Sequence, residues 1–347
     1  MVQKRAERQK EVFTQWAQQN HEPVITPGGT DTLADQASVV RNPFFGMAGS
    51  PLSAYRFLAY VRTGTPEYAV LSLALSKDGT HWAWWKSNST TGAPEPVLKP
   101  GDSGTTNRLN SPHALFHQEK MYVWSSLYDG AFKICLATSA DGFTFGEKIT
   151  VLKANTNSTA FDSLTVQAPT VLLEGEKVRM WYIGGKSVNG EKYYSLGLAE
   201  YDSLTATTPS YRSDALFPAP GQTMPDWTKR KIGFPRIVRY GGKYLLFFCG
   251  QETTDAWMIG LAESDDGLVW KMSKEEPILT PSEGAWNSFT VYSPSVLIRD
   301  TASTEQASED RSGVPAAYGA FMYFGGSDSN TTGAKAQTGV TWSPLVS

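Results

Sequence analysis

The chain has 347 residues, a formal net charge of −3 and an aromatic content of 12%. A chain of this length can bury a large core, either as one big β domain or as two average domains. The small net charge gives no sign of a polyanion-binding surface, so we predict no nucleic-acid partner. No apolar run is long enough to cross a membrane, and residues 1–19 are charged and lack the apolar core of a secretory signal. We therefore predict a soluble, cytoplasmic protein without a membrane partner.

The N-terminal segment, residues 1–19, is predicted to form an amphipathic helix, because Val12, Phe13 and Trp16 can share one face. This helix is a candidate surface for packing on the rest of the chain or for forming a homo-oligomer. Helical periodicity is scarce after residue 20, while glycine, proline and aromatic residues are abundant. That composition is typical of an all-β domain.

Residues 22–27, Glu-Pro-Val-Ile-Thr-Pro, have two close copies at 95–100 and 276–281. Each copy follows a strand–turn–strand unit and is predicted to be the last strand of a repeat. The first copy has no such unit before it. We therefore predict that residues 22–27 pair with the C-terminal repeat and remove an open sheet edge there.

A second recurring phrase alternates apolar and small residues, reaches an Asp-Gly step, and continues to an aromatic residue. The alternation predicts a half-buried strand, and Asp-Gly predicts a tight turn with positive φ at glycine. Its copies lie at 73–82, 136–145 and 257–270, with a degenerate copy at 198–203.

The third pattern is a proline that opens a strand, followed by a short turn and an aromatic-rich strand, as in Pro112 to Trp124. In the first repeat we predict that Pro43 has this place, with Pro51 as the alternative. An aromatic residue recurs at a fixed offset ahead of three of the prolines. The other copies begin at Pro169, Pro235 and Pro294, and the aromatic residues are Phe161, Trp227 and Trp286.

Together these patterns predict five units of about four strands each, and hence an all-β, five-bladed β-propeller. We predict an N-terminal helix over 1–20 and one propeller domain over 21–347, with 301–314 as a polar loop. Cys135 and Cys249 lie in apolar runs and are predicted to be buried free thiols rather than a disulfide. The units span 37–101, 102–155, 156–225, 226–282 and 283–347, and 22–27 closes the last one.

Residues 260–270, Gly-Leu-Ala-Glu-Ser-Asp-Asp-Gly-Leu-Val-Trp, together with the preceding segment 235–248, resemble the five-bladed glycosidases. These are the furanosidase-type families of arabinanases, xylosidases, levanases and invertases, with related phosphorylases. The resemblance extends over nearly the whole chain after residue 20. It implies a central pocket in which one carboxylate acts as the acid and another as the base or nucleophile.

In the arabinanase-like members, the base lies in an Asp-Pro step of the first blade and the acid in a Glu-Gly-Pro step of a later blade. The steps that look similar here are Asn42-Pro43 and Gln167-Ala168-Pro169. An amide has nearly the shape of the acid but cannot cycle a proton. If these steps correspond, the usual pair of catalytic carboxylates has been lost.

Other carboxylates are candidates for these roles. Asp162 follows Phe161 just before a predicted inner strand, although Asn287 in the matching place of the last repeat indicates a structural, turn-capping group instead. Asp35 and Asp31 precede the first predicted blade and are close enough to reach the pocket mouth, unless they lie in a solvated loop. We predict Asp162 and Asp35 as catalytic residues, together with His113.

His113 is predicted on an inner strand and would suit an acid or base, although a satisfied core histidine is the plainer interpretation. No other His or Cys is spaced to make a metal site with it, so we predict neither a metal nor a cofactor. Several cations near the starts of inner strands, Arg230 among them, favour an anionic ligand unless they are simply exposed. The predicted ligand-binding residues are Asn42, Arg108, Asn110, Gln167, Lys231, Arg236, Asn287 and Tyr292.

Two hypotheses about function follow. The first is a carbohydrate-active glycoside hydrolase that acts in a central pocket. The second is a propeller that has lost the hydrolytic pair and either binds a small ligand or catalyses a non-hydrolytic step such as cyclisation or isomerisation. Facing carboxylates about 5–10 Å apart would favour the first, while amides, aromatic rings and cations would favour the second. In either case the predicted partner is a saccharide or another small molecule.

Overall fold

A computed structural model describes residues 13, 16–18, 22–101, 107–252, 256–298, 318–329, 331 and 334–344. Most of the predicted N-terminal helix and the whole predicted loop 301–314 lie outside these residues. The described end of the N-terminal segment, Ala17–Gln18, is a short strand and not a helix, so the prediction is wrong there. No helix in the described part of the chain has the length and apolar character needed to cross a membrane.

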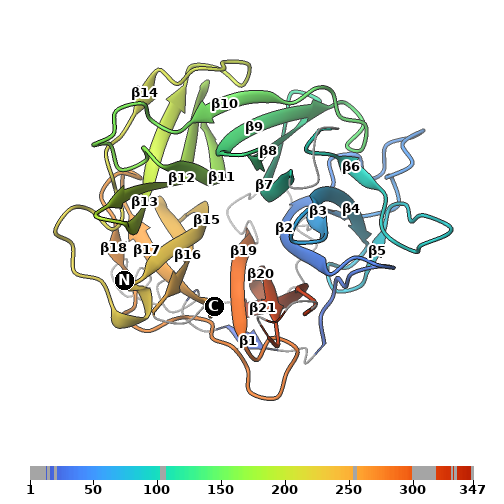
Figure 1. Ribbon diagram of the computed structural model, residues 1–347. Coiled ribbons are helices and arrows are strands. Elements are labelled where there is room, and N and C mark those ends of the chain that lie inside the picture. Colours follow the sequence, from blue (N-terminus) through green and yellow to red (C-terminus); the bar gives the residue numbers. More distant parts are fainter. Residues whose placement is uncertain are drawn as a thin grey trace, which may run out of the picture.

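The regular secondary structure of the described chain is almost entirely β, in antiparallel strand groups that surround a common centre (Figure 1). The first group consists of β2 (Leu33–Arg41), β3 (Phe57–Gly64) and β4 (Ala69–Ser76), with β5 (Trp82–Trp84) and β6 (Pro96–Leu98) both paired to β4. The second group consists of β7 (Arg108–His117), β8 (Lys120–Tyr128), β9 (Phe132–Ser139) and β10 (Ile149–Lys153). A single parallel pair, Ala69 with Arg108, joins these two groups.

The remaining strands form three separate four-stranded sheets. The third group is β11 (Thr165–Glu174), β12 (Lys177–Val188), β13 (Glu191–Tyr201) and β14 (Tyr211–Arg212). A 3-10 turn η1 (Asp226–Thr228) precedes the fourth, which is β15 (Lys231–Tyr240), β16 (Lys243–Gln251), β17 (Met258–Ser264) and β18 (Lys271–Met272). The fifth is β19 (Thr290–Ile298), β20 (Tyr318–Ser327) and β21 (Gln337–Pro344), with β1 (Ala17–Gln18) paired to β21.

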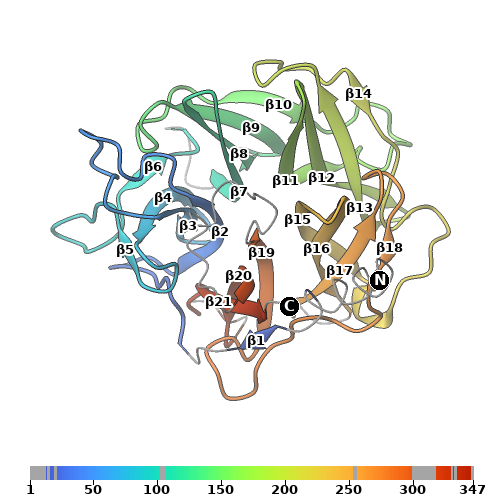
Figure 2. The same ribbon diagram turned by 180° about the vertical axis from the view of Figure 1, so that it is seen from behind.

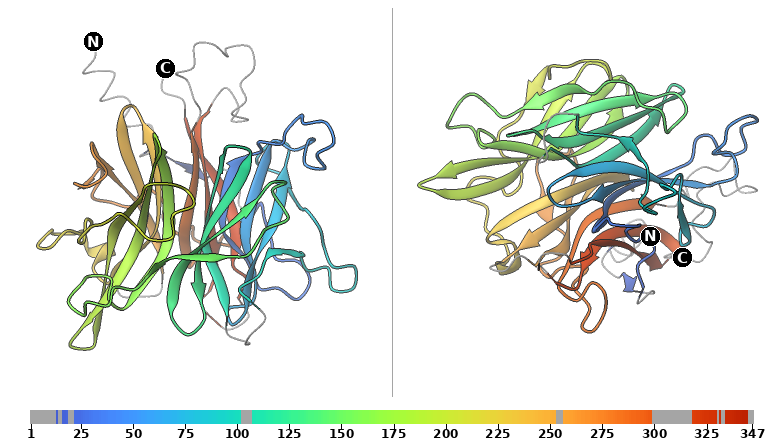
Figure 3. Two further views of the ribbon diagram at one scale, coloured as in Figure 1. Left: turned by 90° about the horizontal axis from the view of Figure 1, so that it is seen from above. Right: turned by 45° about the vertical axis from the view of Figure 1, so that its right-hand side comes forward.

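The first strand of each group lies innermost, and these five strands follow one another around the centre (Figures 1 and 2). β2 contacts β7, β7 contacts β11, β11 contacts β15, β15 contacts β19, and β19 contacts β2. Five buried apolar clusters fill the spaces between successive groups, including one between the fifth group and the first. Seen from the side, the sheets stand next to one another (Figure 3).

Every innermost strand has a β-bulge at the same place. A residue with positive φ, between 48° and 53°, lies at the register shift of each strand. In four strands a proline follows, which a bulged innermost strand tolerates because its unpaired edge, facing the centre, needs no donor there. The bulged residues with positive φ are Gln36, Ser111, Ala168, Phe234 and Ser293.

The innermost strands begin earlier than the sequence patterns predicted. Each proline lies inside its strand rather than opening it, since β7 begins at Arg108, four residues before Pro112. In the first group Ala37 takes the place of the proline, and Pro43 lies in a turn after β2. The first innermost strand therefore starts at Leu33, earlier than the predicted unit boundary at residue 37.

The recurring aromatic residues stack on the second strand of their groups. Phe161 stacks on Tyr182, with 29° between the ring planes, and Trp227 and Trp286 stack in the same way on Phe248 and Phe324. Glycines make room for these rings, because a Cβ at Gly197 would lie 2.3 Å from the Phe161 ring. These aromatic residues are therefore part of the scaffold.

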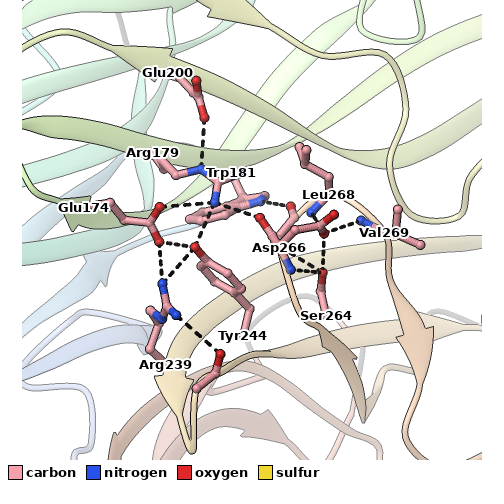
Figure 4. Close-up of polar contacts among 12 residues, drawn as sticks. Glu174, Arg179, Trp181, Glu200, Arg239, Tyr244, Ser264, Asp266, Leu268 and Val269 are labelled. Atoms are coloured by element: carbon pink, nitrogen blue, oxygen red, sulfur yellow. Dashed lines mark hydrogen bonds and ion pairs between the residues drawn. The ribbon is translucent and has the colours of Figure 1, made fainter.

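The Asp-Gly turns hold neighbouring groups together. In the turn after β17, Asp266 accepts the backbone N–H groups of Leu268 and Val269, and Ser264 accepts that of Gly267 (Figure 4). The Trp181 indole, from the preceding group, donates to the Gly267 carbonyl at 2.9 Å. Tyr60 and Tyr323 donate in the same way to the carbonyls of Gly142 and Gly79 in the other two turns.

The three Glu-Pro segments also have equivalent places. Leu98 pairs with Leu71 on β4, Leu279 with Ile259 on β17, and Ile25 with Thr338 on β21. The N-terminal segment thus completes the edge of the last sheet. Both cysteines are buried free thiols, which confirms that prediction.

Candidate functional site

The residue two positions after each bulged residue joins its strand to the next innermost strand. The hydroxyls of Ser38, Thr170 and Ser295 accept the backbone N–H groups of Ala114, Ile237 and Val39, at 2.9, 3.0 and 3.0 Å. His113 bonds to the backbone of Val171, and Arg236 Nε donates to the Pro294 carbonyl at 3.4 Å. We call Ser38, His113, Thr170, Arg236 and Ser295 the post-bulge set.

The post-bulge set is buried and links each innermost strand to the next. Arg236 Nη1 lies 2.5 Å from His113 Nδ1, which must accept this hydrogen bond. Burial and the neighbouring Arg236 charge hold the pKa of His113 well below its ordinary value, so the imidazole is neutral. Burial also lowers the pKa of Arg236 to about 10, which leaves it charged at neutral pH. The structure thus places both predicted site residues in a buried network that links the innermost strands.

The residue just before each bulged residue defines a second set: Asp35, Asn110, Gln167, Gly233 and Tyr292, which we call the pre-bulge set. Four of them were predicted as site residues, and the structure brings them to equivalent positions on the innermost strands. Asn110 and Gln167 are half-buried, whereas Asp35 is fully buried. Equivalent positions on neighbouring strands thus carry a carboxylate, two amides, a glycine and a phenol.

A chain of polar contacts crosses this set. Arg62 binds both oxygens of Asp35, Nε to Oδ1 at 2.7 Å and Nη2 to Oδ2 at 2.5 Å. Tyr292 donates its hydroxyl to Asp35 Oδ2, and Arg62 Nη1 donates to Asn110 Oδ1 at 3.1 Å. Burial works against the charge on Arg62, but the Asp35 carboxylate outweighs it and raises the pKa of Arg62. Burial and Asp35 together raise the pKa of Tyr292, so its hydroxyl remains a donor.

Aromatic rings continue the site on the side of β15 and β19. The Phe234 ring centre lies 5.3 Å from that of Trp257 and 5.5 Å from that of Tyr292. The Lys231 ammonium lies over the Trp257 ring, 4.8 Å from its centre. Trp257 and Phe234 are half-buried, so part of each ring is accessible. Tyr292 connects this aromatic wall to the polar chain.

The two predicted catalytic carboxylates have different surroundings. Asp162 lies before β11 and accepts hydrogen bonds from Tyr182 on β12, at 2.6 Å, and from Arg212 on β14, with Nε at 2.8 Å. Its contacts are therefore with the second and fourth strands of its own sheet, whereas Asp35 is part of an innermost strand. Asn287 matches Asp162, since both side chains crowd a glycine that the preceding aromatic residue also covers.

The remaining predicted residues lie apart from the pre-bulge set or at its edge. The Asn42 amide donates to the carbonyls of Leu52 and Tyr55, at 2.8 and 2.7 Å, and holds the loop after β2. It is seven residues beyond Asp35, about 23 Å along an extended strand. Arg108, at the start of β7, donates to the Pro66 carbonyl and covers the Tyr128 ring. Asp31 is half-buried and burial raises its pKa.

The innermost strands, all of which the structure describes, contain only two acidic residues. One is Asp35. The other, Glu174, is at the far end of β11, where it pairs with Arg179 and Arg239 and accepts the Tyr244 hydroxyl (Figure 4). In the described part of the chain, no group of three His, Cys, Asp or Glu side chains is placed to hold a metal ion.

Sequence reasoning missed Arg62, Phe234 and Trp257. Arg62 was the most detectable, because it is a lone charge in the otherwise apolar strand Phe57–Gly64. A buried charge in such a strand requires a partner. Phe234 and Trp257 gave weaker signals, since each looked like another scaffold aromatic.

No protein-family description matches this sequence, and no curated protein resembles it closely enough to count as a match. Solved structures do resemble it. A thermostable family-43 glycoside hydrolase has a TM-score of 0.65 and 15% identity, covering 92% of each chain. An N-acetylgalactosamine deacetylase from F. plautii, in complex with blood group B trisaccharide, has a TM-score of 0.64 and 15% identity, covering 93% of this chain and 96% of its own.

A putative glycoside hydrolase from Bacteroides ovatus is also similar, with a TM-score of 0.61 and 12% identity, and covers 94% of this chain and 95% of its own. At this level of identity the likeness concerns the fold. The chain therefore has the arabinanase- and xylosidase-type β-propeller fold of the family-43 glycoside hydrolases, as the sequence resemblance implied.

Proposed function

We propose that the chain is a five-bladed β-propeller that binds a saccharide at its pre-bulge set and lacks the acid pair of ordinary glycoside hydrolysis. Five blades are supported by the five innermost strands, which contact one another in a closed order. The single observation that carries the function is the composition of the pre-bulge set. Asp35 is its only carboxylate, and Gln167 stands where the resemblance implies the acid.

Asp35 is poorly suited to act as a base because both its oxygens accept hydrogen bonds from Arg62 and one also accepts from Tyr292. Its role in this proposal is to fix those two donors in place. The half-buried amides of Asn110 and Gln167 each offer a donor and an acceptor to sugar hydroxyls. The Trp257 and Phe234 rings offer an apolar surface to the face of a sugar ring. Aromatic rings beside a few polar groups suit a small polar ligand.

The test is a pair of measurements on the purified chain. Calorimetry with arabino- and xylo-oligosaccharides should detect binding, while aryl arabinofuranosides and xylosides should not be hydrolysed. Trp257→Ala should weaken binding about tenfold or more, the cost of losing a stacked aromatic contact. Tyr211→Ala removes a ring that is 47% exposed on β14 and should leave affinity unchanged.

Hydrolysis is the second candidate, because Asp35 occupies the first innermost strand, where the resemblance implies the base. Turnover of an aryl glycoside that disappears in Asp35→Asn would establish it and reject the binding proposal. The same assay on Gln167→Glu asks whether restoring one acid is sufficient for cleavage. Under our proposal it is not, since Asp35 remains tied to Arg62.

A further inference from the structure

A cavity lies beside the aromatic wall, between the third and fourth groups. It has a volume of about 260 Å³ and is lined by the ends of β12 and β13, the segment after β14, and the start of β15. This volume is below the roughly 300–1,000 Å³ of drug-sized sites. The cavity therefore suits one small group and not a whole oligosaccharide.

The lining of this cavity is strongly basic. Four of its residues are cationic, and none of the described residues that line it is acidic; the cations are Lys186, Lys229, Arg230 and Lys231. Lys229 forms an ion pair with Asp226 at 2.6 Å, with both side chains more than 60% exposed, so this pair lies at the rim. Cations that converge on one concave surface create a positive potential that attracts an anion.

Tyrosines complete the lining. Tyr193 and Tyr194 come from β13, and the Lys231 ammonium lies 6.0 Å from the centre of the Tyr194 ring. Burial raises the pKa of Tyr194 even though the nearby Arg230 charge opposes this, so the phenol is a neutral donor at physiological pH. Neutral donors and cations together suit an oxyanion.

Lys231 connects this cavity to the proposed saccharide site. It lines the cavity, its ammonium lies over the Trp257 ring, and it is two residues before Gly233 of the pre-bulge set. A ligand whose sugar ring rests on Trp257 can thus place a neighbouring substituent in the cavity.

We propose that the cavity binds an oxyanion carried by the saccharide, so that the ligand is an acidic sugar with a carboxylate, sulfate or phosphate group. This inference rests on the proposed function, because it places the sugar itself on the aromatic wall. Binding of the anion and binding of the sugar ring are separate contributions. They can be measured with different probes.

The experiment compares three probes by calorimetry: a uronic-acid oligosaccharide, its neutral methyl ester, and inorganic phosphate. The acid should bind at least about tenfold more tightly than the ester, as expected for charge-assisted hydrogen bonds. The double variant Lys186→Gln/Arg230→Gln should remove this preference and leave affinity for the ester unchanged. Lys192→Gln is the matched control, because it removes the same charge from the same hairpin but does not line the cavity.

The outcomes distinguish failure of the oxyanion site from failure of the saccharide site. Equal affinity for acid and ester, or an equal loss in the Lys192→Gln control, would overturn the oxyanion site and leave the saccharide site standing. Phosphate binding that the double variant abolishes, with no saccharide bound, would support the oxyanion site and overturn the saccharide proposal. No binding of any probe would reject both. Phosphate bound as tightly as the uronide would identify the free anion, and not the sugar acid, as the ligand.

Discussion

The pre-bulge and post-bulge sets lie three residues apart on the same five strands, yet they differ in what their side chains bond to. Each post-bulge side chain bonds to the next innermost strand, and the set is buried. In the pre-bulge set, Asp35 and Tyr292 bond to each other and to neighbouring side chains, while Asn110 and Gln167 are half-buried. Position relative to the bulge therefore separates residues that link the innermost strands from residues that, under our proposal, form the saccharide site.

The largest effect should come from the one buried ion pair in the pre-bulge set. Asp35→Ala should lower the free energy of unfolding by about 3 kcal/mol, because it leaves the Arg62 guanidinium buried without its carboxylate. The Arg62 side chain is only 16% exposed. Urea denaturation measures the change.

The matched control is Asp129→Ala, which breaks the pair with Lys133, whose side chain is 25% exposed. Exposed pairs contribute about 1 kcal/mol or less. Equal losses of unfolding free energy in the two variants would mean that Asp35 and Arg62 do not form a tight buried pair. The contrast between the pre-bulge and post-bulge sets would then be weaker.

A direct comparison of the two sets comes from β11. Thr170→Val keeps the shape of the side chain but leaves the Ile237 N–H without its acceptor, and should cost about 2 kcal/mol of stability. Gln167→Ala, three residues earlier and half-buried, should change stability by about 0.5 kcal/mol or less. If the two losses are similar, or Gln167→Ala costs more, the assignment of closure to the post-bulge set is wrong.

The last prediction is a pH dependence of stability due to His113. Its pKa is lowered in the folded protein, so below about pH 6.5 the unfolded chain binds a proton that the native chain does not. The contribution of His113 to the free energy of unfolding is fully present above the pKa that the residue has in the unfolded chain. Below that pKa the contribution falls with decreasing pH, by at most about 1.4 kcal/mol per pH unit.

Urea titrations between pH 7 and pH 5 measure this slope. This pH range lies above the ordinary pKa values of carboxylates. His113→Gln should reduce the slope, although it lowers stability at pH 7. A native slope that survives in His113→Gln would show that another group is responsible.

Much of the fold could be predicted because its signals are local. Asp266 and Gly267 form a turn through hydrogen bonds within a few residues, and the Glu-Pro segment at 22–27 repeats two others by sequence alone. The innermost strand of the first group was misplaced because its bulge has Ala37 where the others have proline. As a result, the sequence comparison placed Asn42 where the resembling family has its catalytic aspartate. In the structure, the residue on β2 that is equivalent to Gln167 on β11 is Asp35 and not Asn42.

The all-β class, the turns, the repeating scaffold aromatics and the buried cysteines could therefore be predicted from sequence, since side-chain alternation and turn chemistry depend on neighbours along the chain. Which polar residues meet depends on the three-dimensional arrangement of the strands. Tyr292 reaches Asp35 across 257 residues of sequence, and Arg236 reaches His113 across 123. Such contacts depend on how the sheets are arranged around the centre, and no local pattern records that arrangement.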